Sequence, residues 1–131
     1  MKFLWASFLL LLVVTGCRKD PLAHLEGDYK GSFQRQVPGS GIPLRSHVSL
    51  HFSQNHYSGS SDINRYPALC QGQYEFEGSE LHITSSCFYT ADFDWTLIFN
   101  GSYQYQFEGS TLRLWKDLPN GTRDLYILER Q

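Results

Sequence analysis

The chain has 131 residues, enough for one ordinary domain and too few for two. It carries 11 Lys and Arg against 13 Asp and Glu, so it lacks the basic excess that a nucleic-acid-binding surface requires. Aromatic residues make up 15% of the chain, and this content together with the low net charge excludes an intrinsically disordered protein.

The N-terminus has the parts of a secretory signal peptide. Residues 1–16 begin with the basic Lys2, continue with an apolar run from Phe3 to Val14, and end in two small residues. This run is 12 residues long, whereas a transmembrane helix needs about 20 apolar residues. We therefore predict a cleaved leader at residues 1–16 rather than a membrane span.

The exit of the leader, Val14-Thr15-Gly16-Cys17, resembles the lipobox of bacterial lipoproteins. The resemblance implies that Cys17 becomes the first residue and carries acyl chains that hold the protein to a membrane of the cell envelope. In enterobacterial sorting an Asp after the cysteine means inner-membrane retention, so Arg18 favours the outer membrane. Residues 17–25 are then the lipidated cysteine and a tether, and 26–131 the folded domain. The alternative is a secreted protein in which Cys17 is incidental.

After Cys17 the chain alternates apolar and polar residues, with Gly, Asn and Ser at the breaks, and no stretch keeps a helical period over ten residues. Clear examples are residues 27–33 and 47–52, whereas the Pro-containing stretches 36–46 and 62–69 are predicted loops. We predict an all-β fold, an antiparallel meander of about eight to ten short strands. Closure into a barrel would remove the exposed edges of such a meander.

Two segments, 73–83 and 104–114, match at an offset of 31 residues with seven of eleven positions identical. Each is predicted to be a β-hairpin with a two-residue Gly-Ser turn of type II′. Two copies are too few for a solenoid, so they indicate recurrent hairpins in one meander. A further hairpin is predicted at Gln54-Asn55, where Phe52 would face Tyr57.

The other predicted turns lie further along the chain. Asn100-Gly101, alone or with Ser102, is predicted to join a strand at 95–99 to one at 103–107. The three-residue version is favoured because it places the apolar side chains of both strands on one face. A last hairpin turns at 119–121 and ends in Leu125 and Ile127.

The register of the first repeated hairpin predicts a disulfide bond. With Gly78-Ser79 as the turn, facing residues have numbers that sum to 157, and Cys70 and Cys87 satisfy this condition. They fall in the non-hydrogen-bonded class, where Cα atoms approach to about 4.5 Å. Closing this loop should contribute about 3 kcal/mol in the chain-entropy model. The alternative, redox-active or metal-binding thiols, usually shows a CxxC or zinc-type spacing, which this pair lacks.

Gly27-Asp28-Tyr29 is similar to the Gly-x-Trp motif in the first strand of the lipocalin-like (calycin) superfamily, with Tyr in place of Trp. In that family an arginine near the C-terminus packs over this aromatic ring. Arg130 is at the matching position in the sequence, whereas Arg123 comes too early in the chain. Residues 91–103 also resemble a stretch of uncharacterised small envelope lipoproteins. The resemblance implies a barrel over residues 25–130, although the chain is shorter than full lipocalins and lacks room for their long helix.

As the lipocalin resemblance implies, the first function hypothesis is a barrel that binds a small apolar or amphipathic ligand in its interior or at its mouth. Leu50 and Phe76 belong to the proposed wall. Its tentative ligand-binding residues are Tyr29, Phe33, Phe52, Tyr57, Tyr74, Tyr103, Tyr105 and Phe107. Inward tyrosine hydroxyls need a partner or a ligand. The alternative is that these rings simply fill the barrel, as side chains do in small barrels.

The second hypothesis is an interaction lipoprotein that binds an envelope protein, or inhibits a hydrolase, through its loops. Membrane-bound lysozyme inhibitors are barrel lipoproteins of comparable size, although this chain carries none of their motif. The candidate surfaces are residues 36–46 and 88–95. The aromatic residues of the second surface (Phe88, Tyr89, Phe93 and Trp95) would form a binding edge if exposed and a barrel lid if buried.

The third hypothesis, an enzyme, has little support. Five histidines (24, 47, 51, 56 and 82) have no ligand spacing, and His47 and His51 would lie about 13 Å apart along one strand. Asp92 and Asp94 lack a third oxygen ligand for Ca²⁺. The sequence has no phosphate-binding glycine loop and no nucleophile elbow. We therefore predict a non-catalytic protein with no metal and no cofactor.

Overall fold

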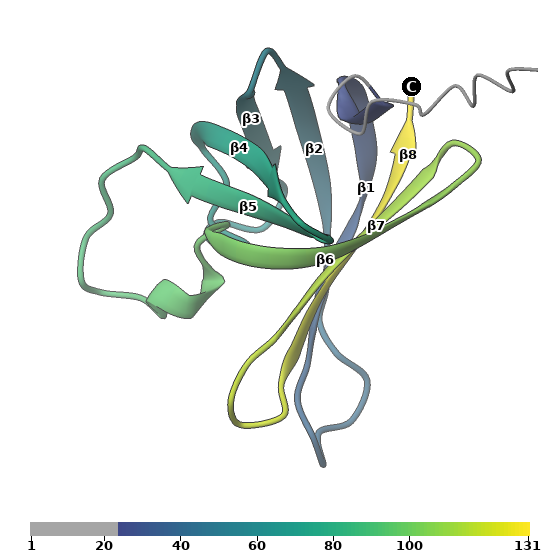
Figure 1. Cartoon of the computed structure of the whole chain (residues 1–131). Helices are drawn as coiled ribbons and strands as arrows, with labels where there is room; N and C mark the ends of the chain where they lie inside the picture. Colours follow the sequence, from purple (N-terminus) through teal and green to yellow (C-terminus); the bar gives the residue numbers. More distant parts are fainter. Residues whose placement is uncertain (1–23) are drawn as a thin grey trace, which may run out of the picture.

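The computed structural model describes residues 24–131; the predicted leader and Cys17 lie outside the described residues. This part of the chain forms eight antiparallel strands in a closed barrel (Figure 1). The strands are β1 (Gly27–Gln36), β2 (Arg45–Ser53), β3 (His56–Ser61), β4 (Gln71–Glu77), β5 (Glu80–Ser85), β6 (Gly101–Glu108), β7 (Thr111–Asp117) and β8 (Arg123–Arg130). The predicted all-β meander is confirmed. Over residues 24–131 no helix has the length and apolarity to cross a bilayer.

The two-residue turns have the predicted geometry. Gln54 and Asn55 both take positive φ, 50° and 66°, as a type I′ turn requires. Gly78 and Gly109 take φ of 60° and 61° at the first turn position, which fits type II′ and favours glycine there. The predicted pairing follows: Phe52 faces Tyr57 across β2 and β3. Both members of the sequence repeat are hairpins, β4–β5 and β6–β7, in equivalent registers.

The barrel has two different ends, because alternate connections of an antiparallel meander lie on the same side. One end, here called the turn end, carries the three two-residue turns, residues 24–26 and the C-terminus (Figure 1). The opposite end, the loop end, carries the connections at 37–44, 62–70, 86–100 and 118–122. The sequence therefore places all of its long loops together.

The seam between β1 and β8 closes the barrel. Eight consecutive residue pairs join the two strands, from Tyr29–Arg130 to Gln36–Arg123. A Cβ atom at Gly31 would lie 1.9 Å from the carbonyl oxygen of Ile127, so a glycine is required for this close approach. The last strand turns Tyr126 and Leu128 inward, whereas Leu125 and Ile127 are only half-buried.

Arg130 packs over Tyr29 at the turn end, the contact predicted from the sequence. Its guanidinium carbon lies 5.2 Å from the ring centroid of Tyr29, and Nη2 donates to the Tyr29 hydroxyl at 2.7 Å. The same group also donates to the carbonyl oxygens of His24 and Glu26. Arg123 instead pairs with Asp117 on the surface. Leu25, which the sequence analysis assigns to the tether, is instead fully buried in the core.

The predicted strand at 95–99 is wrong. Residues Trp95–Leu97 form a short 3-10 helix, η1, and β6 pairs directly with β5, from Glu80–Gln104 to Ile83–Gly101. Asp94 caps η1 by accepting from the Thr96 amide. The chain then forms a parallel bridge between Ile98 and Ala68, which no local turn pattern specifies. The predicted 95–107 hairpin, in either turn version, is therefore absent from the described chain.

Candidate binding site at the loop end

The connection at 86–100, here called the β5–β6 loop, projects from the loop end (Figure 1). With the adjoining end of β5 it forms a hollow of about 370 Å³. The lining residues are Ser85, Cys87, Phe88, Tyr89, Trp95, Ile98 and Asn100. Phe88 is fully exposed and Trp95 is 56% exposed, which is unusual for large apolar side chains. Two of the four predicted aromatics thus form an exposed edge, while Tyr89 and Phe93 are half-buried.

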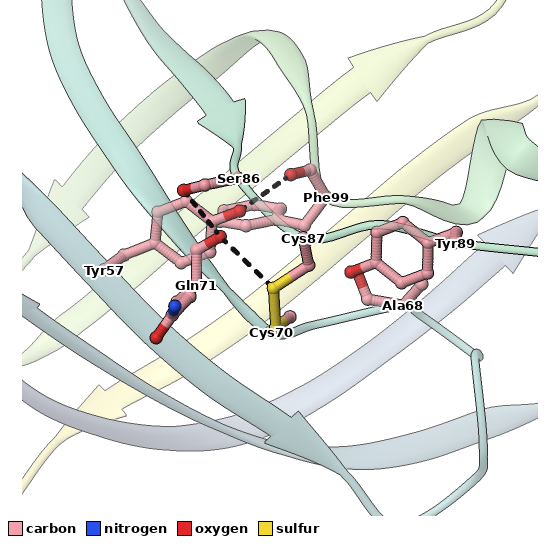
Figure 2. The surroundings of a disulfide bond; sticks show 8 residues. All are labelled: Tyr57, Ala68, Cys70, Gln71, Ser86, Cys87, Tyr89 and Phe99. Carbon is pink, nitrogen blue, oxygen red and sulfur yellow. Dashed lines mark hydrogen bonds between the residues drawn. A yellow bond between two sulfur atoms is a disulfide. The ribbon is translucent and has the colours of Figure 1, made fainter.

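A disulfide bond pins the base of this loop. Cys70 and Cys87 are bonded, as predicted, and Figure 2 shows the bond linking the two chain segments beside Gln71. Their Cα atoms lie 6.4 Å apart, more than the predicted about 4.5 Å. The reason is that the pairing of β4 with β5 ends at Gly72 and Ser85, so the cysteines lie just beyond the ladder. Nearby, the Tyr89 hydroxyl reaches the carbonyl oxygen of Ala68 at 3.5 Å.

Arg35 holds η1 against the barrel. Its guanidinium makes a bidentate bond to Asp124, with Nε at 2.7 Å and Nη2 at 2.8 Å from the carboxylate oxygens. The remaining donors reach Asp94 at 3.0 Å and Thr96, at both its hydroxyl and its carbonyl oxygen. The side chains of Arg35 and Asp124 are only 12% and 3% exposed. This ion pair fixes the position of η1, and with it that of Trp95.

Polar contacts within the β5–β6 loop also order it. Trp95 Nε1 donates to the carbonyl oxygen of Thr90 at 2.9 Å. Arg65 pairs with Asp92 at 2.8 Å and lies over the ring of Phe93, 4.8 Å from its centroid. The Thr90 hydroxyl, and next Arg65, hold the pKa of Asp92 below its ordinary value. The loop is therefore held in place by its own polar and cation–π contacts.

A second apolar surface lies on the 37–44 connection at the same end of the barrel. Ile42 is fully exposed, Leu44 is 58% exposed and Val37 is 45% exposed. Tyr66 joins this connection to the barrel, because its hydroxyl donates to the carbonyl oxygen of Leu44 and its ring packs on Phe33. The two loop surfaces predicted from the sequence therefore both lie at the loop end, and each carries exposed apolar side chains.

The tentative ligand-binding residues point into the barrel. Six of them (Tyr29, Phe33, Phe52, Tyr57, Tyr74 and Tyr103) are buried, and Tyr105 and Phe107 are half-buried and packed against the core. Their rings contact one another edge to face, as Phe52 does with Tyr29 and Tyr74. The interior is a buried aromatic core. Two hydroxyls within it, those of Tyr74 and Ser46, have no hydrogen-bond partner among the described residues.

Burial controls the ionisation of the interior tyrosines. Desolvation raises the pKa of Tyr57 to about 12, and burial also raises the pKa values of Tyr103 and Tyr126. The Tyr57 hydroxyl donates to the carbonyl oxygen of Phe99 at 3.2 Å, a bond visible in Figure 2. These phenols are therefore neutral hydrogen-bonding groups at physiological pH.

Several important residues were not anticipated from the sequence. Tyr126 packs in the core against Phe99 and Tyr103, and Arg35 and Asp124 form the buried ion pair. The alternation of inward and outward side chains did indicate one member of this ion pair, because continuing the alternation from Phe33 places Arg35 inward. For Tyr126 it gave no indication, since residues 125–128 are uniformly apolar or aromatic.

The two aspartates weighed for catalysis or Ca²⁺ binding do not form a common site. Asp92 and Asp94 have separate partners, Arg65 and Arg35. In residues 24–131, no group of three or more His, Cys, Asp and Glu side chains is placed to share an ion.

Comparison with known proteins does not identify the chain. No protein-family model, no curated protein and no solved structure matches it. The function is therefore inferred from the structure of the barrel and its loop end.

Proposed function

We propose that this protein is a non-catalytic binding module that holds an apolar side chain of a protein partner in the hollow of the β5–β6 loop. The observation that carries the proposal is the exposure of Phe88 and Trp95 on a loop anchored by a disulfide and by Arg35. Aromatic side chains on ordered loops are the usual centres of binding energy in protein interfaces.

The charges at the loop end favour an apolar partner surface. Arg65, Arg35 and Arg123 each pair with an aspartate of the same chain. Ile42 and Leu44 on the neighbouring connection extend the apolar area. A surface with paired charges and exposed apolar groups gains more from burying an apolar segment than from attracting a charged ligand.

The second part of the proposal is the location. The lipobox resemblance supports acylation of Cys17 and, with Arg18, anchoring in the outer membrane of a bacterial envelope. The chain enters the barrel at the turn end, seven residues after Cys17, a reach of at most about 25 Å. With such an anchor, the turn end lies nearest the membrane and the loop end faces away from it. The binding hollow would then be open to partners in the surrounding compartment.

Site-specific photo-cross-linking tests the partner. A benzophenone amino acid is introduced at Phe88 in the full chain, in cells, with Glu77 at the turn end as the matched control position. We expect a discrete protein adduct from position 88, none from position 77, and loss of the adduct when Trp95→Ala is added. Adducts of equal yield at both positions, or an adduct insensitive to Trp95→Ala, would contradict the proposal.

A second candidate, a small apolar or amphipathic ligand inside the barrel, is favoured by the unpartnered hydroxyls of Ser46 and Tyr74. A ligand would have to displace rings of the aromatic core to reach them. Native mass spectrometry of the protein isolated from the envelope, followed by organic extraction, separates the two candidates. A reproducible apolar molecule that is lost in Tyr74→Phe supports this candidate, whereas a clean apo mass excludes it.

A further inference from the structure

The outer face of β1, β2 and β3 brings together three side chains that the proposed function does not use. Asp28 on β1 faces His51 on β2 in register. One row closer to the β2–β3 turn, Ser53 faces His56 on β3. His51 and His56 are therefore diagonal neighbours on the same outer face, at a Cα separation of about 7–8 Å.

Asp28 orients the first imidazole. Nδ1 of His51 donates to the carboxylate Oδ1 of Asp28 at 2.6 Å, and the two side chains are 52% and 73% exposed. Because the carboxylate accepts, this bond places a proton on Nδ1, and in the neutral imidazole the free lone pair is then on Nε2. A carboxylate bonded to one ring nitrogen while the other faces outward is the usual arrangement of a metal-ligating histidine.

His56 supplies the second imidazole. Both histidines line one surface hollow of about 340 Å³, together with Ser53, Ser58 and Gln71. A metal ion takes histidine nitrogen at about 2.0–2.1 Å, and an imidazole extends several ångströms from the backbone. Two rings on a diagonal of this length can therefore reach a single ion between them.

We propose that His51 and His56 form a surface site for a divalent transition metal, with Asp28 as the residue that positions His51. Imidazole ligands without thiolates suit Cu²⁺ and Zn²⁺, and Cu²⁺ binds such sites most tightly. The described chain offers two ligands, so water or an outside ligand completes the coordination. The inference is independent of the proposed partner hollow, which lies on other residues.

Ser58 faces His51 on the other side, which makes an Asp–His–Ser row across the three strands. A serine nucleophile would also need amide donors for an oxyanion. Around Ser58 the backbone of β3 is paired with β2 on one edge and β4 on the other, so these amides are occupied. The row therefore favours metal binding over acyl transfer.

Titration with Cu²⁺ alone tests the site. The protein is purified after expression of the full chain without a polyhistidine tag, stripped with chelator, and titrated calorimetrically at pH 7.5. We expect one ion to bind per chain at this pH. Electron paramagnetic resonance should show two imidazole nitrogens on the ion.

The variants separate ligation from folding. His51→Gln and His56→Gln should each weaken binding at least tenfold, and Asp28→Asn about tenfold, since it removes only the positioning carboxylate. His82→Gln is the matched control, a histidine on the outer face of β5 that contacts Ser102. Thermal melting confirms that each variant is folded. Unchanged binding in His51→Gln or His56→Gln, or an equal loss in His82→Gln, overturns the proposal.

Discussion

At the scale of single residues, Arg35 links the barrel to the β5–β6 loop. It contacts Asp124 inside the barrel and both Asp94 and Thr96 on the loop. A buried carboxylate is costly without its cation, so Asp124 depends on this contact. One side chain therefore couples the stability of the core to the position of Trp95.

Replacing Arg35 by Gln should destabilise the protein by about 3 kcal/mol, because it leaves Asp124 buried without a counter-charge. Urea denaturation measures the change, and the fluorescence of Trp95 should shift as η1 is released. Arg45→Gln is the matched control, since Arg45 is exposed and the one side-chain bond of its guanidinium among residues 24–131 is to Gln34. If Arg35→Gln and Arg45→Gln have equal effects, the ion pair does not hold the loop.

Arg130 should contribute more than a surface arginine. It packs on Tyr29 and bonds its hydroxyl and two carbonyl oxygens, so Arg130→Met should cost about 2 kcal/mol of unfolding free energy. Arg123→Met breaks only the exposed pair with Asp117 and should cost less than about 1 kcal/mol. Chemical denaturation of both variants measures the two losses of unfolding free energy. Equal losses would show that Arg130 does not stabilise the barrel more than a surface arginine does.

Tyr57 should make the fold sensitive to alkali. Its pKa is raised to about 12 by burial, whereas an unfolded tyrosine ionises near pH 10. Its contribution to stability is complete below pH 10 and is lost as the pH rises toward 12, by up to about 1.4 kcal/mol for each pH unit. Urea unfolding at pH 9, 10 and 11 should show a steeper decline for the wild type than for Tyr57→Phe. Parallel declines would contradict the raised pKa.

At the scale of elements, the repeated hairpins form from local sequence. Gly78-Ser79 and Gly109-Ser110 specify the turns, and alternation selects which side chains face the core. The position of the disulfide followed from the same register, and only its Cα separation differed. The structure of the β5–β6 loop, in contrast to that of the hairpins, is not specified locally. Its η1 helix and its bridge to Ala68 depend on a segment about 30 residues away.

Removing the disulfide should loosen this loop as well as the whole fold. Cys70→Ser with Cys87→Ser should lower the unfolding free energy by about 3 kcal/mol through the larger entropy of the unfolded chain. Hydrogen exchange should show the largest loss of protection at residues 86–100, with residues 104–114 as the internal reference. Equal protection of the two segments in the variant would show that the disulfide does not order the loop.

At the scale of the whole molecule, the meander separates two ends with different properties. The chain enters and leaves at the turn end, and the exposed aromatic residues lie at the loop end. This separation suits a protein attached at one end and binding at the other.

Cys17→Ala tests the attachment. The proposed acyl chains need the thiol, so the variant should be found in the soluble envelope fraction while the wild type sediments with membranes. Immunoblots of fractionated cells measure the distribution, and Cys70→Ser/Cys87→Ser is the control that leaves Cys17 in place. Retention of Cys17→Ala in the membrane fraction would contradict lipidation.

The primary sequence was enough for the features that depend on neighbours along the chain. Turn residues and period-two alternation specified most of the strands, the hairpin registers and the partner of Cys70, because each involves residues within one hairpin. Contacts between distant segments became apparent only in the folded barrel. They are the pairing of β5 with β6, the η1 helix, and the ion pair of Arg35 with Asp124 across 89 residues. The aromatic hollow belongs to this second group. Its residues were named from the sequence, but their exposure depends on how the loop packs against the closed barrel.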